Sequence, residues 1–297
     1  MGEALIDIIV DPAGEVTSVV GGAPLNTART IARLGEDAAF LGGVSTDAFG
    51  ERILRMLTAD GVSLALGHQV IEPSTLAIAQ IDAGGAATYR FMLDGTSAAA
   101  VTADMALGCL RPDVSVIHVG TLGLVLEPLA SASAALVAAA SDSQIVMVDP
   151  NCRPSVMTSS GVFDATLASV LERADVVKVS GDDLAFMFPG ERAATAAEQM
   201  HMRTGATVLF TDGAESVRVI CSGEVRVLDV PSVPVADTVG AGDSFSGGFL
   251  AHWVRKGWTR ADLGYMDKVV EAAKFGIRVA GITCQRAGAE PPFSHEL

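Results

Sequence analysis

Asp237-Thr-Val-Gly-Ala-Gly-Asp-Ser-Phe-Ser-Gly-Gly-Phe249 carries the strongest structural signal in this chain of 297 residues. A β-prone run at 225–230 precedes it, and Phe245, Phe249 and Trp253 then recur at the spacing of a helix that packs on a sheet. The glycines therefore stand at the turn that opens a buried helix. Small residues there expose consecutive backbone N–H groups, and the helix dipole adds partial positive charge. The run predicts an anion-binding site between a strand and a helix.

Asp243 stands in the first turn of that helix, beside the predicted anion site. An acidic residue is favourable there in any helix, but Gly240, Gly242, Gly247 and Gly248 are more glycines than a helix start requires. A hydroxyl that attacks phosphorus must lose its proton, and a carboxylate within hydrogen-bond reach can accept it. We therefore predict that Asp243 is the general base of a phosphoryl transfer, with backbone donors stabilising the transferring group.

Three other motifs fail on inspection. In a G-x-G-x-x-G motif the third glycine would fall on Phe245, and the run lies near the C-terminus rather than on a first βα turn. Dinucleotide binding is therefore not indicated. No G-x-x-x-x-G-K-[ST] run occurs in the sequence, which excludes a P-loop enzyme. No G-x-S-x-G run surrounds Ser244 or Ser246, which argues against a serine hydrolase.

The composition limits the remaining classes of protein. Hydrophobic residues make up 49% of the chain, but the apolar stretches are short or interrupted, so no membrane span is expected. Glu3 and Asp7 stand where a signal peptide would be apolar, and we expect a soluble, cytoplasmic protein. A net charge of −15 without any Lys or Arg run argues against a nucleic-acid surface. The four cysteines and five histidines are scattered, which disfavours a zinc site.

Segments typical of strands and of helices alternate along most of the chain. This rhythm predicts a doubly wound α/β fold, in which helices cover both faces of a mostly parallel sheet and functional residues gather at the carboxyl ends of strands. No repeat or linker interrupts it, so we expect residues 1–297 to form a single domain. Strands are expected at 38–44, 114–119, 145–149, 175–179, 207–211 and 225–230, and helices at 47–59, 129–140 and after residue 240.

Two segments break this rhythm. Residues 8–20 contain a turn at 11–14 between β-prone runs, and residues 75–93 are typical of two strands around a turn at 82–85. Apolar and polar residues alternate in both, as in strands that are half exposed to solvent. We expect a small β lid from about 8–20 and 71–95. An ordinary edge hairpin is equally consistent with the pattern.

Two runs together resemble the signatures of the ribokinase family, the carbohydrate kinases of the phosphofructokinase-B type. The first is Gly21-Gly-Ala-Pro-Leu-Asn-Thr-Ala28, continued by Ala32-Arg-Leu-Gly35, and the second is the glycine-rich run quoted above. The resemblance implies an α/β kinase domain with a β lid, ATP and Mg²⁺ as cofactors, and a potassium-type cation. Met1 falls directly before Gly2 and Glu3, where relatives carry more strand residues, so the first strand should lose part of its central pairing.

The resemblance also implies roles for individual residues. Asp243 is the base, and Gly240, Ala241 and Gly242 form the anion hole. The residues expected on the substrate side are Asp7, Gly21, Gly22, Asn26, Tyr89, Arg90, Asn151 and Arg153. On bare physics Asn26 could equally cap its helix, and Arg90 could equally face solvent.

On the nucleotide side the resemblance points to Lys178, Ser180, Thr211, Gly213 and Gly242, with the helix at 267–280 beside the adenine. Ser180 and Asp183 replace the Asn and Glu that order Mg²⁺ and its waters in the family. Asp183 keeps the carboxylate with a shorter reach. The monovalent-cation loop is expected to contain Asp237, Val239, Thr283, Arg286 and Gly288, mainly through backbone atoms.

Local runs resemble bacterial fructokinases, so the expected reaction is fructose to fructose 6-phosphate. Arg90 on the lid strand would also suit an acid sugar, which keeps 2-keto-3-deoxygluconate kinase open beside ribokinase and nucleoside kinase. A protein of another class, a sugar-binding sensor with weakened catalysis, is a further alternative. Sugar and ATP are the expected partners, together with a second copy of the chain paired through the lid.

Overall fold

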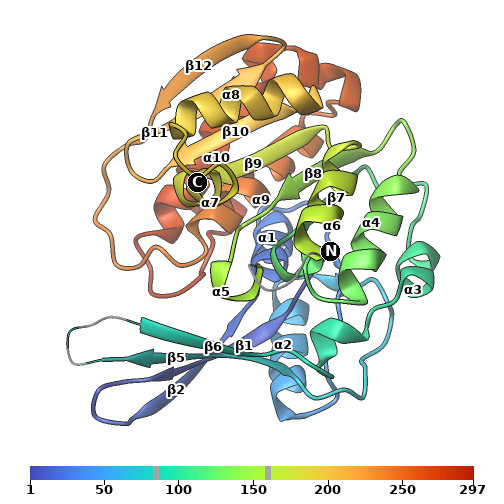
Figure 1. Cartoon of the computed structure of the whole chain (residues 1–297), viewed down its shortest axis with the longest axis vertical. Helices are drawn as coiled ribbons and strands as arrows, with labels where there is room; N and C mark the ends of the chain where they lie inside the picture. Colours follow the sequence, from blue (N-terminus) through green and yellow to red (C-terminus); the bar gives the residue numbers. More distant parts are fainter. Residues whose placement is uncertain (83, 85–86, 158–161) are drawn as a thin grey trace.

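The structure is a computed structural model that describes residues 1–82, 84, 87–157 and 162–297. Its larger sheet has six strands in the order β12-β11-β10-β9-β8-β7 (Figure 1). Their bounds are β7 Val116–Gly120, β8 Ile145–Asp149, β9 Val176–Ser180, β10 Thr207–Asp212, β11 Ser216–Cys221 and β12 Glu224–Asp229.

Parallel pairing dominates the centre of this sheet. β7, β8, β9 and β10 pair in parallel, whereas β11 and β12 form an antiparallel hairpin at the edge. β8 is buried at every position, as expected of a Val/Ile-rich strand covered on both faces. The α/β prediction is therefore confirmed, and the strands predicted at 145–149, 175–179 and 207–211 lie within a residue of the observed ones.

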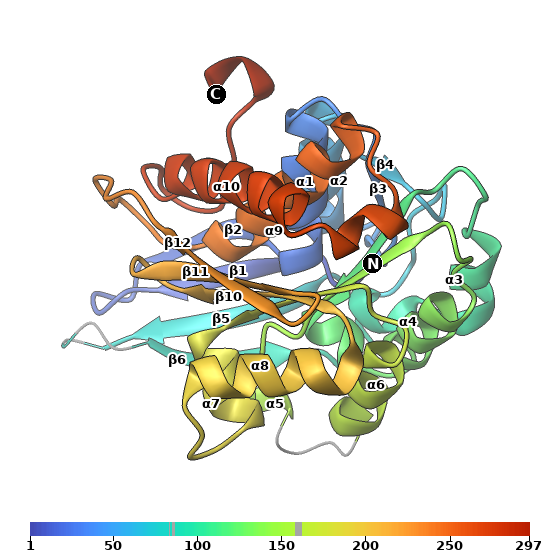
Figure 2. The ribbon, with the colours of Figure 1, turned by 90° about the horizontal axis from the view of Figure 1, so that it is seen from above.

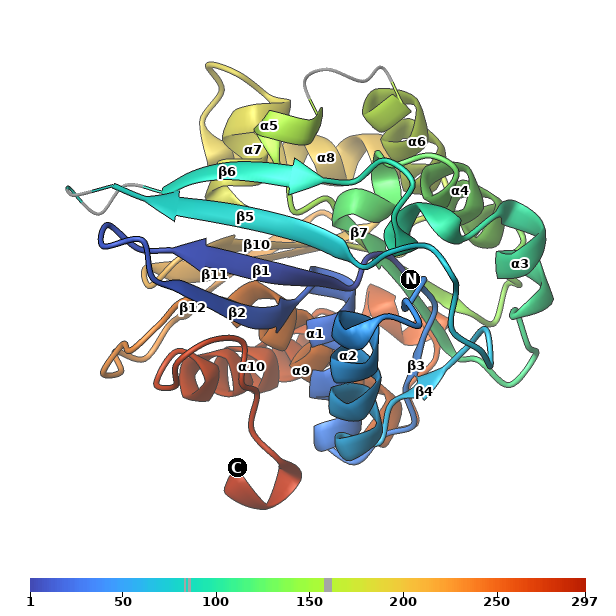
Figure 3. The same ribbon diagram turned by 90° about the horizontal axis from the view of Figure 1, so that it is seen from below.

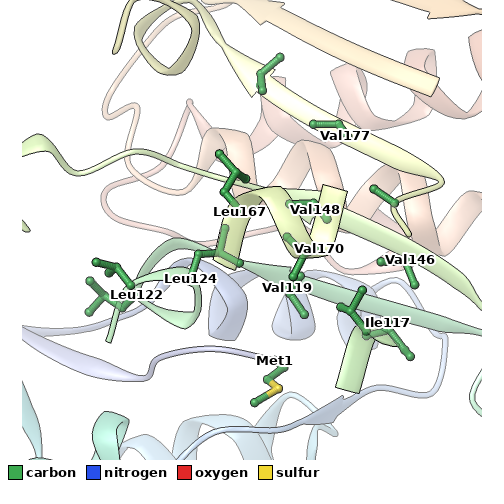
Figure 4. Close-up of a cluster of buried hydrophobic side chains, with 14 of the residues drawn as sticks. Met1, Ile117, Val119, Leu122, Leu124, Val146, Val148, Leu167, Val170 and Val177 are labelled. Atoms are coloured by element: carbon green, nitrogen blue, oxygen red, sulfur yellow. The ribbon is translucent and has the colours of Figure 1, made fainter. Parts of the chain in front are cut away.

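Helices cover both faces of the six-stranded sheet (Figure 2). On one face, strand residues pack with α9 and α10, including Phe249 and Trp253. On the other face they pack with α4, α6, α7 and α8, and part of that cluster is drawn in Figure 4. The α-helices are α1 Ala23–Arg33, α2 Ala48–Ala59, α3 Ala103–Gly108, α4 Leu129–Ala138, α5 Pro154–Met157, α6 Val162–Leu171, α7 Gly181–Met187, α8 Ala193–Thr204, α9 Ala241–Arg255 and α10 Met266–Thr283.

A second sheet projects beside the first (Figure 3) and has the order β2-β1-β5-β6. Its strands are β1 Leu5–Val10, β2 Val16–Gly21, β5 Thr75–Ile81 and β6 Ala87–Met92. β1 pairs with β2 and β5 inside this sheet, while the Met1 amine donates to the carbonyl of His118 in β7. The turn predicted at 82–85 includes residues 83 and 85, which lie outside the described residues.

The prediction of a strand over 38–44 was wrong in its length. β3 covers only Ala39–Phe40, paired with the equally short β4, Ser63–Leu64. The chain then passes against other backbones: a Cβ atom on Gly42 would lie 2.3 Å from the carbonyl oxygen of Gly2, and one on Gly43 would lie 1.8 Å from that of Ser97. Because the backbones approach so closely, these glycines continue as a loop rather than a strand.

Two glycines of the run after Asp243 have a packing role. A Cβ atom on Gly247 would lie 2.5 Å from Cβ of Thr30 in α1, and one on Gly248 would lie 3.0 Å from Cα of Gly276 in α10. These two residues therefore let α1 and α10 approach α9, and only Gly240 and Gly242 remain for the predicted anion site. Among the helices in the described part of the chain, none combines the length and apolar character needed to cross a bilayer.

We expect Gly43→Ala to lower the free energy of unfolding by at least ~1–3 kcal/mol, because the new methyl group must displace the Ser97 backbone. Gly108→Ala, at the end of α3 with open space around it, is the matched control and should change stability by less than ~1 kcal/mol. Urea unfolding of both variants measures this, and equal stability of the two would contradict the explanation for the broken strand.

Candidate functional site

Polar side chains meet where the central parallel strands end. β8 ends at Asp149 and β9 at Ser180, while Lys178 lies two residues before that end. α9 begins at Ala241 on the same side and brings Asp243 beside them, because a Cβ atom on the preceding residue, Gly242, would lie 2.8 Å from Nζ of Lys178. Carboxyl ends of parallel strands share one sheet edge, so residues far apart in sequence converge there.

Asp243 is buried in the first turn of α9, as predicted. Its Oδ2 accepts a hydrogen bond of 2.9 Å from Nδ2 of Asn26, in the first turns of α1. Burial raises the pKa of Asp243, while the Asn26 hydrogen bond and the charges of Lys178 and Arg153 act in the opposite direction. The Asp243 carboxylate is thus removed from water and oriented by a hydrogen bond that it accepts. Both conditions suit a general base.

Lys178 is a buried cation surrounded by carboxylates. Its Nζ lies 3.1 Å from Oδ2 of Asp149. Burial disfavours the charge on Lys178, but Asp149, Asp183 and Asp243 outweigh it and raise the pKa of the ammonium group. Burial also raises the pKa of Asp149 to about 6, and Oδ1 of Asp149 has no hydrogen-bond partner. The ammonium group therefore stays charged in a protein of strongly negative net charge.

The glycine turn lies against this cation. Gly240 precedes α9 with φ 74°, a conformation that favours glycine. A Cβ atom on Gly242 would lie 2.8 Å from Nζ of Lys178, so the ammonium group is beside the predicted anion site. Backbone N–H groups at a helix start and a fixed cation together can hold a phosphate.

Asp7 lies on β1, and the adjacent strand β2 leaves room for its side chain at Gly21. A Cβ atom on Gly21 would lie 2.2 Å from Oδ2 of Asp7. Burial raises the pKa of Asp7 to about 6, against the charge of Arg153. Gly22 follows with φ 122°, and a Cβ atom there would lie 2.5 Å from the carbonyl oxygen of Glu3. Any side chain at either glycine would displace Asp7 or the backbone beneath it.

Asn151 and Arg153 follow β8 and form a local unit. Asn151 has φ 40°, and its Oδ1 accepts a hydrogen bond of 2.7 Å from Nη1 of Arg153. The Arg153 side chain is exposed, and its charge affects Asp7 and Asp243. The positive charge of Arg153 therefore acts to lower the pKa of both carboxyl groups.

We call the four-stranded sheet β2-β1-β5-β6, which contains the predicted lid segments, the lid sheet. Its register separates its two aromatic residues from Arg90. Phe91 and Asp7 both align with Ala77, and Tyr89 is two residues away on the same face. The rings of Tyr89 and Phe91 stack at 6.3 Å between centroids. Arg90 aligns with Ile78 on the opposite face and is exposed. The structure therefore brings Tyr89, but not Arg90, to the face that carries Asp7.

Both carboxylate oxygens of Asp183 already accept hydrogen bonds, from Ser180 at the start of its own helix and from Cys152 after β8. Its Oδ2 accepts from the backbone and hydroxyl of Ser180, both at 2.7 Å, and its Oδ1 accepts from the backbone of Cys152 at 2.6 Å. Within the described residues, no group of three or more His, Cys, Asp or Glu is arranged to hold a metal. The free Oδ1 of Asp149 fits a water-mediated role toward Mg²⁺ better than either oxygen of Asp183.

The loop before α9 and the segment after α10 lie together. Asp237 joins them, because its Oδ1 accepts from the backbone of Val239 at 3.0 Å and its Oδ2 from that of Gly288 at 2.8 Å. Thr283 donates to Ser244 Oγ at 2.9 Å. The side chain of Arg286, by contrast, points to Glu296, with an N–O distance of 2.6 Å.

A groove of about 660 Å³ lies between β12 and α10. Thr211 and Gly213, which are predicted to border the nucleotide, lie at the end of β10. Thr211 donates to the Val179 carbonyl at 3.3 Å, and Gly213 has φ 53°. The groove is mostly apolar, with two basic residues, and its lining includes Leu228, Pro231, Ile277, Ile282, Lys274 and Arg278.

Sequence reasoning missed Glu3 and Asp149 as parts of the site. Glu3 is 1% exposed, and its two oxygens accept from the backbones of Ala23 and Leu122, each at 3.1 Å. It ties the start of α1 to the turn after β7. The available signal for Asp149 was its place at the carboxyl end of a buried strand; Glu3 gave none, since its burial depends on the tertiary fold.

The chain is similar to known proteins over most of its length. A profile of the pfkB family carbohydrate kinases matches residues 1–296. The fructokinase of Rhizobium leguminosarum bv. trifolii is 35% identical over 260 residues, which cover 84% of this chain and 77% of that protein.

Solved structures are similar over nearly the whole chain. A double mutant of fructokinase from Vibrio cholerae, in a fructose, ADP and potassium ion bound form, is 25% identical with a TM-score of 0.83, covering 97% of this chain and 92% of that one. Aminoimidazole riboside kinase from Salmonella enterica, complexed with aminoimidazole riboside and an ATP analog, has a TM-score of 0.85 at 21% identity, covering 99% and 96%. At that identity the likeness concerns the fold alone.

Glu3 provides a pH-dependent test of this arrangement. Burial raises its pKa from 4.5 to about 7, so the unfolded chain releases this proton at lower pH than the folded chain, and stability is lost as the pH rises between these values. The wild type should therefore lose about 3 kcal/mol more than Glu3→Gln between pH 4.5 and pH 7. Urea unfolding at several pH values measures this, and parallel pH profiles would refute it.

Proposed function

This chain belongs to the pfkB family of carbohydrate kinases and is an ATP-dependent sugar kinase, and on that premise we propose that it is a fructokinase. The observation that carries the proposal is the buried carboxylate of Asp243, bonded to Asn26, at a glycine turn that also meets the Lys178 ammonium group. The 35% identity to a fructokinase supports the choice of sugar.

In the proposed mechanism Asp243 accepts the proton of a primary hydroxyl of fructose. The hydroxyl oxygen bonds to the γ-phosphorus of ATP, and the bond from that phosphorus to the bridging oxygen breaks, which releases ADP. The backbone N–H groups of Gly240, Ala241 and Gly242 would stabilise charge on the transferring group, and that of Ala241 would exchange its 3.2 Å bond to the Thr238 carbonyl for the phosphate. Lys178 adds a fixed positive charge. The site thereby compensates for the acidity of the whole protein.

The substrate side is proposed to use the face of the lid sheet that carries Asp7. The Asp7 carboxylate would accept hydrogen bonds from sugar hydroxyls, with Gly21 and Gly22 leaving room for the ring and Asn151 and Arg153 opposite. Tyr89 and Phe91 would cover the sugar from the lid. Arg90 is left out of this set because of its position on the opposite face.

ATP is proposed to place its base in the groove between β12 and α10, where apolar residues can contact the ring. Ser180, Thr211 and Gly213 would then border the phosphates at the strand ends. Mg²⁺ would be held beside the phosphates by Asp149, whose Oδ1 has no hydrogen-bond partner, and through water by Asp183, and when bound it would neutralise part of the phosphate charge. The backbone of Asp237, Val239, Thr283, Arg286 and Gly288 is the proposed site for a monovalent cation, in keeping with the potassium-bound relative.

Nucleoside kinase is the second candidate, because the stacked Tyr89 and Phe91 offer an aromatic surface on the Asp7 face.

Pairing of two copies through the lid also remains a prediction. Exposed Val16, Val19, Tyr89 and Met92 on its outer strands support it, since edge strands with apolar side chains are stabilised by a partner.

We expect Asp243→Asn to lower kcat by at least ~10²-fold, the usual scale for a positioned general base, while ATP still binds. An ADP-release assay with Mg²⁺ over fructose, ribose, 2-keto-3-deoxygluconate and adenosine measures this and ranks the substrates. Turnover of adenosine above fructose would favour the nucleoside kinase. Unchanged turnover in Asp243→Asn would end the proposal.

We expect Asp7→Asn to raise KM for fructose by ~10-fold or more, because a hydrogen bond to a charged acceptor contributes about 1.5–3 kcal/mol. KM for ATP should stay within about twofold, since Asp7 lies on the lid sheet, away from the groove between β12 and α10. Steady-state kinetics with each substrate varied in turn test both statements. A rise in KM for ATP alone would remove Asp7 from the sugar side.

A further inference from the structure

Arg29 is a charged side chain buried in α1, with 2% of its surface exposed. All of its guanidinium nitrogens are bonded. Nε lies 2.6 Å from Oδ2 of Asp60, Nη1 donates to the carbonyl of Ala289 at 2.9 Å, and Nη2 lies 3.2 Å from Oε2 of Glu290. Burying a guanidinium group is costly unless each donor is satisfied, so this residue fixes the chain segments that it bonds.

Asp60 connects Arg29 to a second arginine of the same helix. Its other oxygen, Oδ1, lies 2.8 Å from Nε of Arg33, one turn further along α1. Arg33 donates to the carbonyl of Pro291 at 2.7 Å. We name Arg29, Asp60 and Arg33 the arginine brace. It ties α1 and the end of α2 to the tail segment 289–291.

The tail segment touches the glycine turn at the residue that Arg29 holds. A Cβ atom on Gly240 would lie 2.4 Å from Cβ of Ala289, so Ala289 limits the backbone positions open to Gly240. The preceding residue, Gly288, donates its backbone N–H to Asp237 at 2.8 Å. Arg33 holds Pro291, two residues further away, and pairs with Glu290 at 2.5 Å, whereas the atoms nearest a Cβ atom on Gly240 belong to Ala289.

We propose that Arg29 is a positioning residue for phosphoryl transfer: it holds Ala289 against Gly240 and so fixes the backbone donors at 240–242. This inference rests on the proposed function of that turn. Asn26 lies one turn before Arg29 on the same helix and bonds the base Asp243. One helix therefore sets both the base and the anion hole, and a shift of about 1 Å in such a group can cost ~10²-fold in rate.

The test compares Arg29→Met with Arg33→Met, which remove the same group from the same brace. Arg29→Met should lower kcat by ~10-fold or more with KM for fructose within about twofold. Arg33→Met should lower the thermal midpoint comparably but leave kcat per folded molecule within about twofold. A merely structural role for Arg29 predicts the same kcat for both variants, and that result would overturn the inference.

A binding measurement gives a readout independent of turnover. In the proposed function the donors at 240–242 bind the γ-phosphate, which ADP lacks. Arg29→Met should therefore lose affinity for a non-hydrolysable ATP analogue by more than it loses affinity for ADP. Arg33→Met should change the two affinities equally. Calorimetric titration of both ligands measures the ratio, and an unchanged ratio in Arg29→Met also contradicts the inference.

Ala289→Gly decides the question if Arg29→Met does not fold. It keeps every bond of Arg29 but removes the methyl group that contacts Gly240, so kcat should fall by ~3–10-fold with little change in stability. No fall in kcat would reject the inference. Asp243→Asn distinguishes failure of the inference from failure of the proposed function. If Asp243→Asn is inactive while Arg29→Met and Ala289→Gly have normal kcat, only the role of Arg29 is refuted. If Asp243→Asn is fully active, the proposed function is refuted.

Discussion

The hydrogen bond from Asn26 to Asp243 joins α1, the first helix of the chain, to α9, the helix that follows the glycine turn. It can form only because Gly247 lets Thr30 approach α9 without a side chain between them. Thr27 adds a bond to the backbone of Asp243 itself. The Asp243 carboxylate is therefore held by side-chain hydrogen bonds and by helix packing together, and an error in either would move it.

Charge at the site is arranged against the charge of the whole protein. The chain carries a net charge of −15, yet the site must receive a highly charged phosphate ester. Lys178 supplies a buried positive charge, and the glycine turn supplies backbone donors that carry no counter-charge. Asp149 and Asp183 raise the pKa of Lys178 and keep it charged, which accounts for several carboxylates beside a proposed anion site.

The lid sheet brings the residues that we propose for the substrate side onto one face. Its strands belong to two distant segments, and β1 carries Asp7 directly between β2 and β5. The alternation of side chains along β6 puts Tyr89 and Phe91 on the Asp7 face and Arg90 on the other. A one-residue change of register would put Arg90 on the Asp7 face and the two aromatic side chains on the other. The residues that share a face with Asp7 therefore depend on strand pairing.

Local patterns in the sequence determined the order of strands and helices and the place of Asp243 in the first turn of α9, because period and turn chemistry act over a few residues. They also led to 38–44 as a strand, since nothing local shows that Gly43 meets the Ser97 backbone. The tertiary structure alone decided which charges meet: Lys178 with Asp149, and Arg29 with Asp60. Such pairs form between segments that only the closed chain brings together, and burial then makes each pairing obligatory.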